Sequence, residues 1–363
     1  MKILFVFAHP APYKIDLFNG LAPHIDLTVV FERHSSGFRH PYFYERTNYN
    51  FRTIFLRGIS IGAENHLSFE LIRHLKNNAY DLIVMNGYSS FTEILTIKYL
   101  QRKKRPYVLY VNGGVIHEDP RWRLNLKTKL VSGATHYFSP STHVDSYLRH
   151  YGAQQEQIIH YPYATIYDGD IAAEKISLKQ KHSFWKSLNI PDGPVFISAG
   201  QFIDRKNNIG ILKIWCDRPQ DNQLLLIGSG PDELKYQHFI TEHKMKNVHI
   251  IPYQKRHNLL NLMRYATGFI ILSKEDIYGH VINESLSQGL PVISSRHVTA
   301  ALHLIKNAEN GFLVDLEDTD AINNAITTLI KKDLFANCTA TSRGNTIEKM
   351  VDHHLQTFAN IKL

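Results

Sequence analysis

Two acidic residues in the second half of the chain, Asp276 and Glu284, lie eight residues apart on either side of a predicted turn at Gly279. A helix is predicted to start at His280, so that Glu284 lies about one turn inside it. The first N–H groups of a helix have no partner within it, and together with the helix dipole they favour an anion such as a phosphate. Carboxylate oxygens accept hydrogen bonds from hydroxyl groups. The pattern therefore predicts a ligand that carries a phosphate, a sugar hydroxyl and a ribose diol.

Two cations follow another predicted turn. The segment Gly200–Lys206 comes after the apolar strand Val195–Gly200 and before the helix Asn208–Cys216, and it ends in Arg205 and Lys206. Guanidinium and ammonium groups in such a place can bind a diphosphate and stabilise the charge that grows on it as a sugar leaves. The alternative, which the residues alone leave open, is a pair of solvated surface cations.

A glycine-rich turn, Gly228–Pro231, follows the apolar strand Gln223–Ile227. Glycine lets a backbone approach a ligand closely, so Gly228 and Gly230 at the carboxyl end of a strand are candidates for contact with a nucleotide. A plain tight turn explains the same residues equally well.

The first half of the chain has one polar loop of interest, which follows the strand Tyr107–Val111. Its polar and flexible residues are Asn112, Gly113, Gly114, His117, Glu118 and Asp119. The last three are the best candidates for a general acid or base, and the two glycines would let the loop approach a sugar. The alternative is a polar cap before the helix Arg121–Ser132.

These residues lie on a strand–helix alternation that runs through most of the chain and restarts at Val195 after a looser stretch. Strands separated by helices predict parallel sheets with right-handed crossovers, and ligands of such sheets bind at the carboxyl ends of the strands. A chain of 363 residues suits two domains. We predict a first domain at 1–165, a linker at 166–192, a second domain at 193–345 and a last helical segment at 346–363.

The stretch 274–294 resembles the donor-site signature of the retaining GT-B glycosyltransferases of the GT4 type, also called group 1. That signature usually has two glutamates separated by seven residues. The matching segments are Tyr278-Gly279, Val281–Glu284 and Gly289–Ile293. Asp276 stands in place of the first glutamate, with Glu275 beside it. The turns Gly200–Lys206 and Gly228–Pro231 are similar to two further signatures of the family.

The resemblance implies the GT-B fold, in which two Rossmann-like parallel-sheet α/β domains face a cleft and a C-terminal helix crosses back to the first domain. It implies a nucleotide-diphosphate-sugar in the second domain and a sugar acceptor in the first. Transfer would retain the anomeric configuration, because the leaving diphosphate takes the acceptor proton on the same face. The protein would then mainly position the substrates and stabilise charge, without a metal or a cofactor. A UDP-sugar is favoured over a GDP-sugar.

The same resemblance assigns roles to residues. Arg205 and Lys206 would bind the diphosphate, together with the amides of His280–Asn283. Glu284 would bind the ribose, Asp276 the donor sugar, and Tyr253 would lie near the nucleobase. The predicted donor-binding set is Gly200, Gly228, Gly230, Tyr253, Tyr278, Gly279, His280, Val281, Ile282, Asn283 and Glu284. The predicted catalytic set is Arg205, Lys206, Asp276 and His117, and the acceptor-side set is Asn112, Gly113, Gly114 and Asp119.

Composition describes a soluble globular protein with a basic first half. Residues 1–168 hold 19 Lys and Arg against 13 Asp and Glu, whereas the remainder holds 22 against 20. The basic, Trp-containing helix Arg121–Leu130 fits either an anionic membrane surface, as expected for a lipid-linked acceptor of undecaprenyl type, or a solvated helix face. Two distant cysteines, the lack of a signal peptide and the lack of a long apolar run favour the cytoplasm, with peripheral attachment to the inner face of the plasma membrane.

Other classes of function remain as alternatives. A related GT-B enzyme such as a nucleotide-sugar epimerase would convert the donor without an acceptor. A non-catalytic module for anionic surfaces would explain the basic half but neither the acid pair nor Arg205 and Lys206, and we predict no nucleic-acid partner. Asp168-Gly169-Asp170 spells a metal-binding pattern of a different fold, but it lies in the predicted linker, and no clustered metal ligands are present in the sequence.

Overall fold

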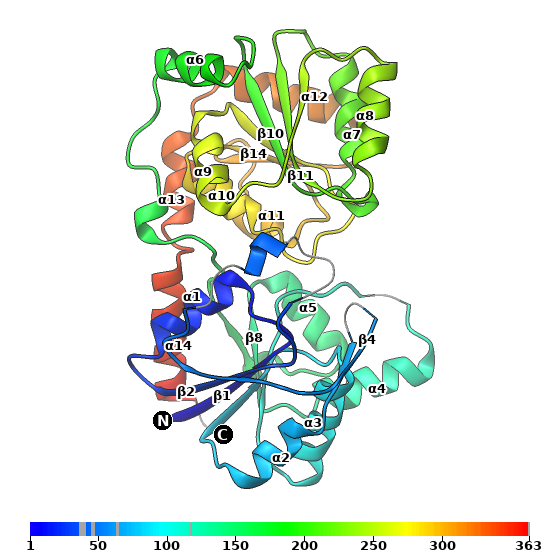
Figure 1. Ribbon diagram of the computed structural model, residues 1–363, viewed down its shortest axis with the longest axis vertical. Helices are drawn as coiled ribbons and strands as arrows, with labels where there is room; N and C mark the ends of the chain where they lie inside the picture. The colour runs from blue at the N-terminus through cyan, green and yellow to red at the C-terminus, as the bar shows by residue number, and fades with distance from the viewer. Residues whose placement is uncertain (36–40, 45–47, 63–64, 117, 362–363) are drawn as a thin grey trace. The chain divides into compact units, whose positions relative to one another are not determined.

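The computed structural model of the protein describes residues 1–35, 41–44, 48–62, 65–116 and 118–361. Its chain divides into two units (Figure 1). The first comprises Met1–Tyr163 and Ile347–Leu363, and the second comprises Ala164–Thr346. Each unit is built on its own parallel sheet with helices on both faces, as the alternation of strands and helices predicts.

The sheet of the first unit has the strand order β3-β2-β1-β6-β7-β8-β9, and all its pairs are parallel. A small antiparallel pair, β4 and β5, lies outside this sheet and was not predicted. The strands are β1 (Lys2–Phe7), β2 (Asp26–Phe31), β3 (Arg52–Phe55), β4 (Ile59–Ile61), β5 (Asn65–Leu67), β6 (Leu82–Met85), β7 (Val108–Tyr110), β8 (His136–Ser139) and β9 (Ile158–His160). The helices are α1 (Pro12–Leu21), α2 (Glu70–Asn77), α3 (Phe91–Arg102), α4 (Arg121–Val131), α5 (Thr142–His150) and α14 (Ile347–Asn360).

The sheet of the second unit has the strand order β12-β11-β10-β13-β14-β15 and is also parallel. Its strands are β10 (Val195–Gln201), β11 (Gln223–Ser229), β12 (Val248–Ile251), β13 (Gly268–Ile271), β14 (Val292–Ser295) and β15 (Gly311–Val314). The helices are α6 (Leu178–Ser187), α7 (Asn208–Cys216), α8 (Glu233–Glu242), α9 (Arg256–Tyr265), α10 (Val281–Ser287), α11 (Thr299–Leu304), α12 (Thr319–Lys331) and α13 (Phe335–Ser342).

Residues 166–192, which we predicted as a linker, belong to the second unit. Its helix α6 packs on α9, where the rings of Phe184 and Tyr265 stack with their centroids 3.9 Å apart. Lys181 Nζ donates to the carbonyl of Ala266 at 2.6 Å, and Trp185 Nε1 donates to the carbonyl of Tyr265 at 3.1 Å. Aromatic side chains among the lysines thus give this helix a buried face, which the loose sequence pattern did not reveal.

The last helix, α14, packs in the first unit, as the fold prediction required. It lies beside α1 (Figure 1). His354 of α14 is fully buried, and its ring stacks on Phe138 at 4.9 Å and on Tyr110 at 5.6 Å between centroids. Phe358 contacts Phe5 of the first strand. The chain therefore returns to its first unit through an aromatic cluster rather than through surface contacts.

Among the described residues, no helix is long and apolar enough to cross a membrane. The same residues contain no group of three or more His, Cys, Asp or Glu that could hold a metal ion.

Two buried carboxylates lie at the carboxyl edge of the first sheet. Glu32 follows β2 and is fully buried, and its Oε1 accepts a hydrogen bond from Ser90 Oγ at 2.5 Å. Glu93 forms a capping box with Ser90 at the start of α3. Burial and the nearby Glu93 carboxylate both raise the pKa of Glu32 above its ordinary value of 4.5. The folded protein therefore keeps a proton that the unfolded chain has lost at neutral pH.

Replacement of this carboxyl, Glu32→Gln, is expected to stabilise the protein at alkaline pH. Because the pKa of Glu32 is raised on folding, its stability contribution is complete below pH 4.5 and is lost as the pH rises through the folded pKa. Melting temperatures at pH 5 and pH 8.5 measure the effect, and Glu156→Gln, at an exposed acid of the same unit, is the control. A variant that loses stability equally at both pH values would show that Glu32 is held as a carboxylate.

Candidate active site

The strand order of the second sheet places two loops side by side. The chain runs outward from β10 through β11 to β12, and then returns to pair β13 with the other side of β10. Ligands of open parallel sheets bind at such a switch point, outside the carboxyl ends of the strands. The loops that leave β10 and β13 carry Arg205, Lys206 and Asp276, which the topology therefore brings to one edge.

The side chain of Lys206 forms an ion pair with Oδ2 of Asp276. Both side chains are largely buried, with 15% and 11% of their surface exposed. Arg205 Nη1 donates to the carbonyl of Glu275 at 3.2 Å, and the Lys274 amide donates to the Arg205 carbonyl at 2.8 Å. The two cations thus belong to one cluster with the Asp276 loop.

Asp276 is the acid that faces the cations. Its amide donates to the carbonyl of His297 at 2.9 Å, and its carbonyl accepts a hydrogen bond from Thr299 Oγ1 at 3.4 Å. Its neighbour Glu275 accepts a hydrogen bond from Arg205 through the backbone carbonyl. Gly279 has a φ of +92°, and a Cβ there would lie 2.4 Å from Val298 Cγ1, so glycine is needed at this turn.

The helix after this turn, α10, begins at Val281 with His280 at its N-cap position. The Ile282 amide donates to the Gly279 carbonyl at 3.0 Å, so of the four amides predicted to bind phosphate, that of Ile282 already has a partner. The Tyr278 side chain is buried, which raises the pKa of its hydroxyl above the ordinary value.

Glu284 is largely buried within the second unit. Its Oε1 accepts a hydrogen bond from Thr165 Oγ1 at 2.9 Å, and only 9% of the residue is exposed. Burial raises the pKa of Glu284, while the Thr165 hydroxyl and the charge of Arg256 act in the opposite direction. The Glu284 carboxylate, which we predicted to bind the ribose, is therefore a buried hydrogen-bond acceptor that interacts with Thr165 and Arg256.

Gly228 and Gly230 serve packing between loops. A Cβ on Gly228 would lie 1.9 Å from the carbonyl oxygen of Gly200, and one on Gly230 would lie 2.4 Å from that of Phe202. The turn therefore packs closely against the loop that carries Arg205. This packing is enough to explain why glycine occurs at both positions, and no contact with a nucleotide is needed to explain it. Tyr253 lies two residues beyond β12, at the same edge of the sheet.

Among the candidates of the first unit, Asn112 is held by three side chains. Its Oδ1 accepts hydrogen bonds from Lys14 Nζ at 3.0 Å and from Tyr161 at 3.3 Å, and its Nδ2 donates to Asn86 Oδ1 at 2.8 Å. Lys14 is buried, which lowers its pKa well below the ordinary value. Asn112 is therefore fixed at the carboxyl edge of the first sheet.

The rest of that polar loop is tied to neighbouring helices. A Cβ on Gly114 would lie 2.7 Å from the Tyr147 ring, so the loop lies against α5 there, and Gly113 precedes this contact. Asp119 Oδ2 accepts from Lys127 Nζ at 2.6 Å and from the Tyr151 hydroxyl at 2.9 Å. The hydrogen bond from Lys127 lowers the pKa of Asp119, which does not suit a general base. His117 lies outside the described residues.

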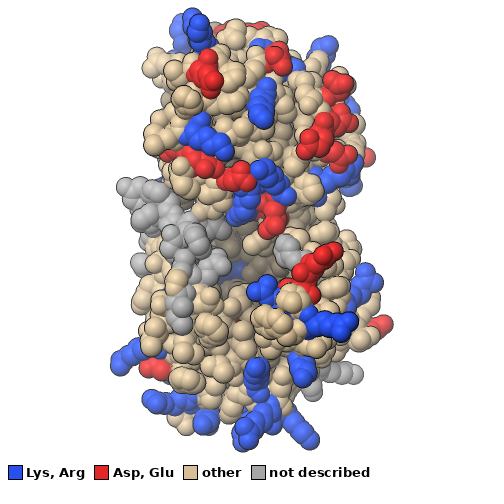
Figure 2. All heavy atoms as spheres, turned by 90° about the vertical axis from the view of Figure 1, so that its right-hand side faces the viewer, with Lys and Arg blue, Asp and Glu red and all other residues tan. Residues whose placement is uncertain are grey.

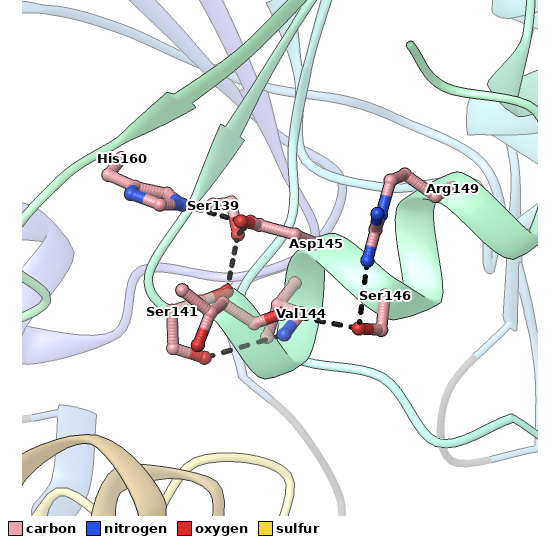
Figure 3. Close-up of polar contacts among 8 residues, drawn as sticks. Ser139, Ser141, Val144, Asp145, Ser146, Arg149 and His160 are labelled. Atoms are coloured by element: carbon pink, nitrogen blue, oxygen red, sulfur yellow. Dashed lines mark hydrogen bonds and ion pairs between the residues drawn. The ribbon is translucent and has the colours of Figure 1, made fainter. Parts of the chain in front are cut away.

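A serine, an aspartate and a histidine also meet in the first unit (Figure 3). Asp145 Oδ1 accepts from Ser139 Oγ at 2.6 Å, and Asp145 Oδ2 lies 2.6 Å from His160 Nε2. The aspartate lies between the other two residues, and Ser139 is fully buried. In a nucleophilic triad the histidine would lie between an accessible serine and the acid. This cluster therefore links β8, α5 and β9 and is not a hydrolase site.

Comparison with known proteins finds a similarity in the second unit. Residues 179–345 match the sequence model of the family described as Glycosyl transferases group 1. This stretch is therefore similar in sequence to the group 1 glycosyl transferases and accounts for 167 of the 363 residues of the chain. The Arg205–Lys206–Asp276 cluster and Glu284 all lie within it.

Two curated relatives align with part of the chain. Over 117 residues it is 27% identical to the N-acetyl-alpha-D-glucosaminyl L-malate synthase of Bacillus anthracis, covering 31% of this chain and 29% of that protein. Over 140 residues it is 26% identical to the lipopolysaccharide core biosynthesis glycosyltransferase LpsE of Rhizobium meliloti, covering 38% and 40%. The matched regions thus span less than half of the length of either relative.

Solved structures resemble the whole chain. Anabaena HepE in complex with UDP has a TM-score of 0.80 at 16% identity, and its complex with UDP-glucose has 0.77 at 17%, each over 99% of this chain and 100% of that one. WaaG, a glycosyltransferase involved in lipopolysaccharide biosynthesis, has 0.72 at 14% over the same shares. These likenesses confirm the predicted fold class of Rossmann-like parallel-sheet domains.

The partners of Glu284 were not predicted from the sequence. Thr165 precedes it by 119 residues, and Arg256 donates through Nη1 to the Thr165 carbonyl. Asp170 of the rejected Asp-Gly-Asp pattern pairs with Arg256 at 3.5 Å. No motif marks Thr165, which the predicted boundary placed at the end of the first domain, whereas it belongs to the second unit together with Glu284.

Proposed function

We propose that the chain is a retaining glycosyltransferase that uses a nucleotide-diphosphate-sugar, a UDP-sugar in preference to a GDP-sugar. The acceptor would be a saccharide or an undecaprenyl-type lipid-linked saccharide in the synthesis of a bacterial capsule, O-antigen or exopolysaccharide. The observation that carries the proposal is the Lys206–Asp276 ion pair at the switch point of a group 1 domain. The UDP and UDP-glucose complexes of HepE support the choice of nucleotide.

In this proposal the cations act on the leaving group. The bond between the sugar's anomeric carbon and the diphosphate oxygen breaks while the acceptor oxygen attacks the same face, and the acceptor proton passes to the diphosphate. Negative charge then grows on the diphosphate, and Arg205 and Lys206 stabilise it. The diphosphate competes with Asp276 for Lys206, which leaves the Asp276 carboxylate to accept a hydroxyl of the donor sugar. Two cations offset the charge, so we propose that no metal ion is needed.

The site of action would be the inner face of the plasma membrane. On the face drawn in Figure 2, Lys and Arg predominate over the first unit, whereas both signs of charge mix over the second. Helix α4 carries exposed Arg121 and Arg123, and its Trp122 is 66% exposed. Basic residues around an exposed tryptophan suit the interface of an anionic bilayer. Co-sedimentation with anionic but not with neutral vesicles, lost in Trp122→Ala, tests this part.

A thermal-shift panel of UDP-, GDP- and ADP-sugars, followed by transfer assays with the donor of largest effect, tests the function. We expect a UDP-sugar to raise the melting temperature, and NMR of the product to show the anomeric configuration of the donor. Activity should persist in EDTA. Absence of stabilisation by any nucleotide-sugar would contradict the proposal, an inverted product would contradict retention, and donor conversion without acceptor would indicate an epimerase.

Loss of the proposed ribose contact, Glu284→Ala, is expected to weaken UDP binding about tenfold to a hundredfold, since a hydrogen bond to a charged group contributes about 1.5–3 kcal/mol. Isothermal titration calorimetry measures the dissociation constant. The control is Glu242→Ala, at an exposed acid of the same unit. Unchanged affinity in the Glu284 variant would remove this residue from the site.

A further inference from the structure

The segment by which the chain enters the second unit touches the proposed ribose contact. The second unit begins at Ala164, and the next residue, Thr165, donates its hydroxyl to Glu284 Oε1 at 2.9 Å. Thr165 is 4% exposed and Glu284 is 9% exposed. A buried hydroxyl–carboxylate hydrogen bond of this kind fixes the plane and the position of the carboxylate.

Thr165 is itself held in place through its backbone. Arg256 Nη1 donates to the Thr165 carbonyl, and Arg256 Nη2 lies 3.5 Å from Asp170 Oδ2. The guanidinium also lies 5.5 Å from the centre of the Tyr167 ring. The guanidinium of Arg256 therefore contacts both ends of the segment 165–170.

The same segment is bonded to the helix that carries Glu284. Gln288 Nε2 donates to the Asp170 carbonyl at 2.7 Å, and the Ala172 amide donates to the Ser287 carbonyl at 2.8 Å. Thr165 thus approaches Glu284 from a segment that is anchored along α10 at several points. Its hydroxyl has little freedom to leave the carboxylate.

This contact changes the chemistry of the carboxylate. Burial favours the protonated form of Glu284, whereas the Thr165 hydroxyl and the Arg256 charge favour the ionised form. An ionised carboxylate offers about four acceptor positions. One donor at Oε1 therefore leaves positions for the two hydroxyl groups of a ribose.

We propose that Thr165 is a positioning residue for the nucleotide, whose hydroxyl holds the Glu284 carboxylate in the orientation that accepts the ribose diol. The inference rests on the proposed function, because it takes the ribose of a nucleotide as the ligand of Glu284. It adds to that function a residue outside the segment that matches the family model.

The test compares two ligands, UDP and 2′,3′-dideoxy-UDP, by isothermal titration calorimetry. Thr165→Val is expected to weaken UDP binding about tenfold, the range expected for one hydrogen bond to a charged group. Binding of the dideoxy analogue should not change, because it offers Glu284 no diol. Thr165→Ser should restore UDP affinity, and Thr241→Val, at an exposed threonine of α8, is the matched control.

The pH dependence of UDP binding gives a second readout. Without the hydroxyl, the pKa of Glu284 rises further, so the loss of affinity on acidification should begin at a higher pH in Thr165→Val than in the wild type.

Equal loss of both ligands in Thr165→Val, or unchanged UDP affinity, would overturn the inference while leaving the proposed function intact. Failure of the wild type to bind UDP would overturn both.

Discussion

Replacement of Lys206 by alanine is expected to lower kcat/KM for the sugar donor about a hundredfold to a thousandfold, the cost observed when one group that stabilises transition-state charge is removed. Lys206 is the ammonium group paired with Asp276 at the switch point of the second sheet. Because it would stabilise the diphosphate most as the sugar leaves, the loss should appear mainly in kcat. Steady-state release of UDP at varied donor concentration separates kcat from KM.

The matched control is Lys274→Ala. Lys274 lies two residues from Asp276 and forms an exposed ion pair with Asp204 at 2.8 Å, so the variant removes an equal charge from the same loop. We expect it to leave kcat within about twofold of the wild type, since exposed ion pairs contribute little. Equal losses in the two variants would mean that general surface charge, and not the position of Lys206, supports the reaction.

Acidification is expected to destabilise the first unit through His354. Burial is the main cause that lowers the pKa of this residue from 6.5 to about 3. The unfolded chain takes up the proton below pH 6.5 and the folded chain does not, so stability is complete above pH 6.5 and falls as the pH falls towards 3. At 1.36 kcal/mol for each unit of difference, the loss at pH 4.5 is about 3 kcal/mol.

Urea denaturation of the wild type and of His354→Leu at pH 7 and pH 4.5 measures this effect. The leucine variant loses the ring stacking on Phe138, and so it should be less stable at pH 7. The further loss on acidification should be smaller by about 3 kcal/mol than in the wild type. His238→Gln, at an exposed position of the second unit, should follow the wild type. An unchanged loss in the leucine variant would show that another group takes up the proton.

Much of the fold follows from the sequence because its signals are local. Strands such as β1 and β11 are buried over most of their length and contain the continuous apolar runs Ile3–Phe7 and Leu224–Ile227, as is typical of parallel sheets. The last helical segment, predicted at 346–363, contains the helix Ile347–Asn360, which belongs to the first unit. The position of residues 166–192 could not be predicted, because the packing of Trp185 and Phe184 depends on α9, more than seventy residues away.

The same distinction between local sequence signals and distant contacts applies to the candidate site. Asp276, Arg205 and Lys206 lie in the loops that leave β13 and β10, so the strand order alone brings them together. Contacts made by side chains across the fold gave no signal in the sequence, as with Thr165 on Glu284 and Lys127 on Asp119. The sequence also left open whether Gly228 contacts a nucleotide or forms a plain tight turn. In the structure it packs against the backbone carbonyl of Gly200 in the same unit.

Hydrogen–deuterium exchange in the presence of UDP is the most direct test that a diphosphate binds at the switch point of the second sheet. We predict slower exchange in the loop after β10, at 202–207, and from the loop after β13 into α10, at 272–284. No change should occur in the peripheral helix α12. Protection confined to the first unit, or to segments of the second unit away from β10 and β13, would contradict the account.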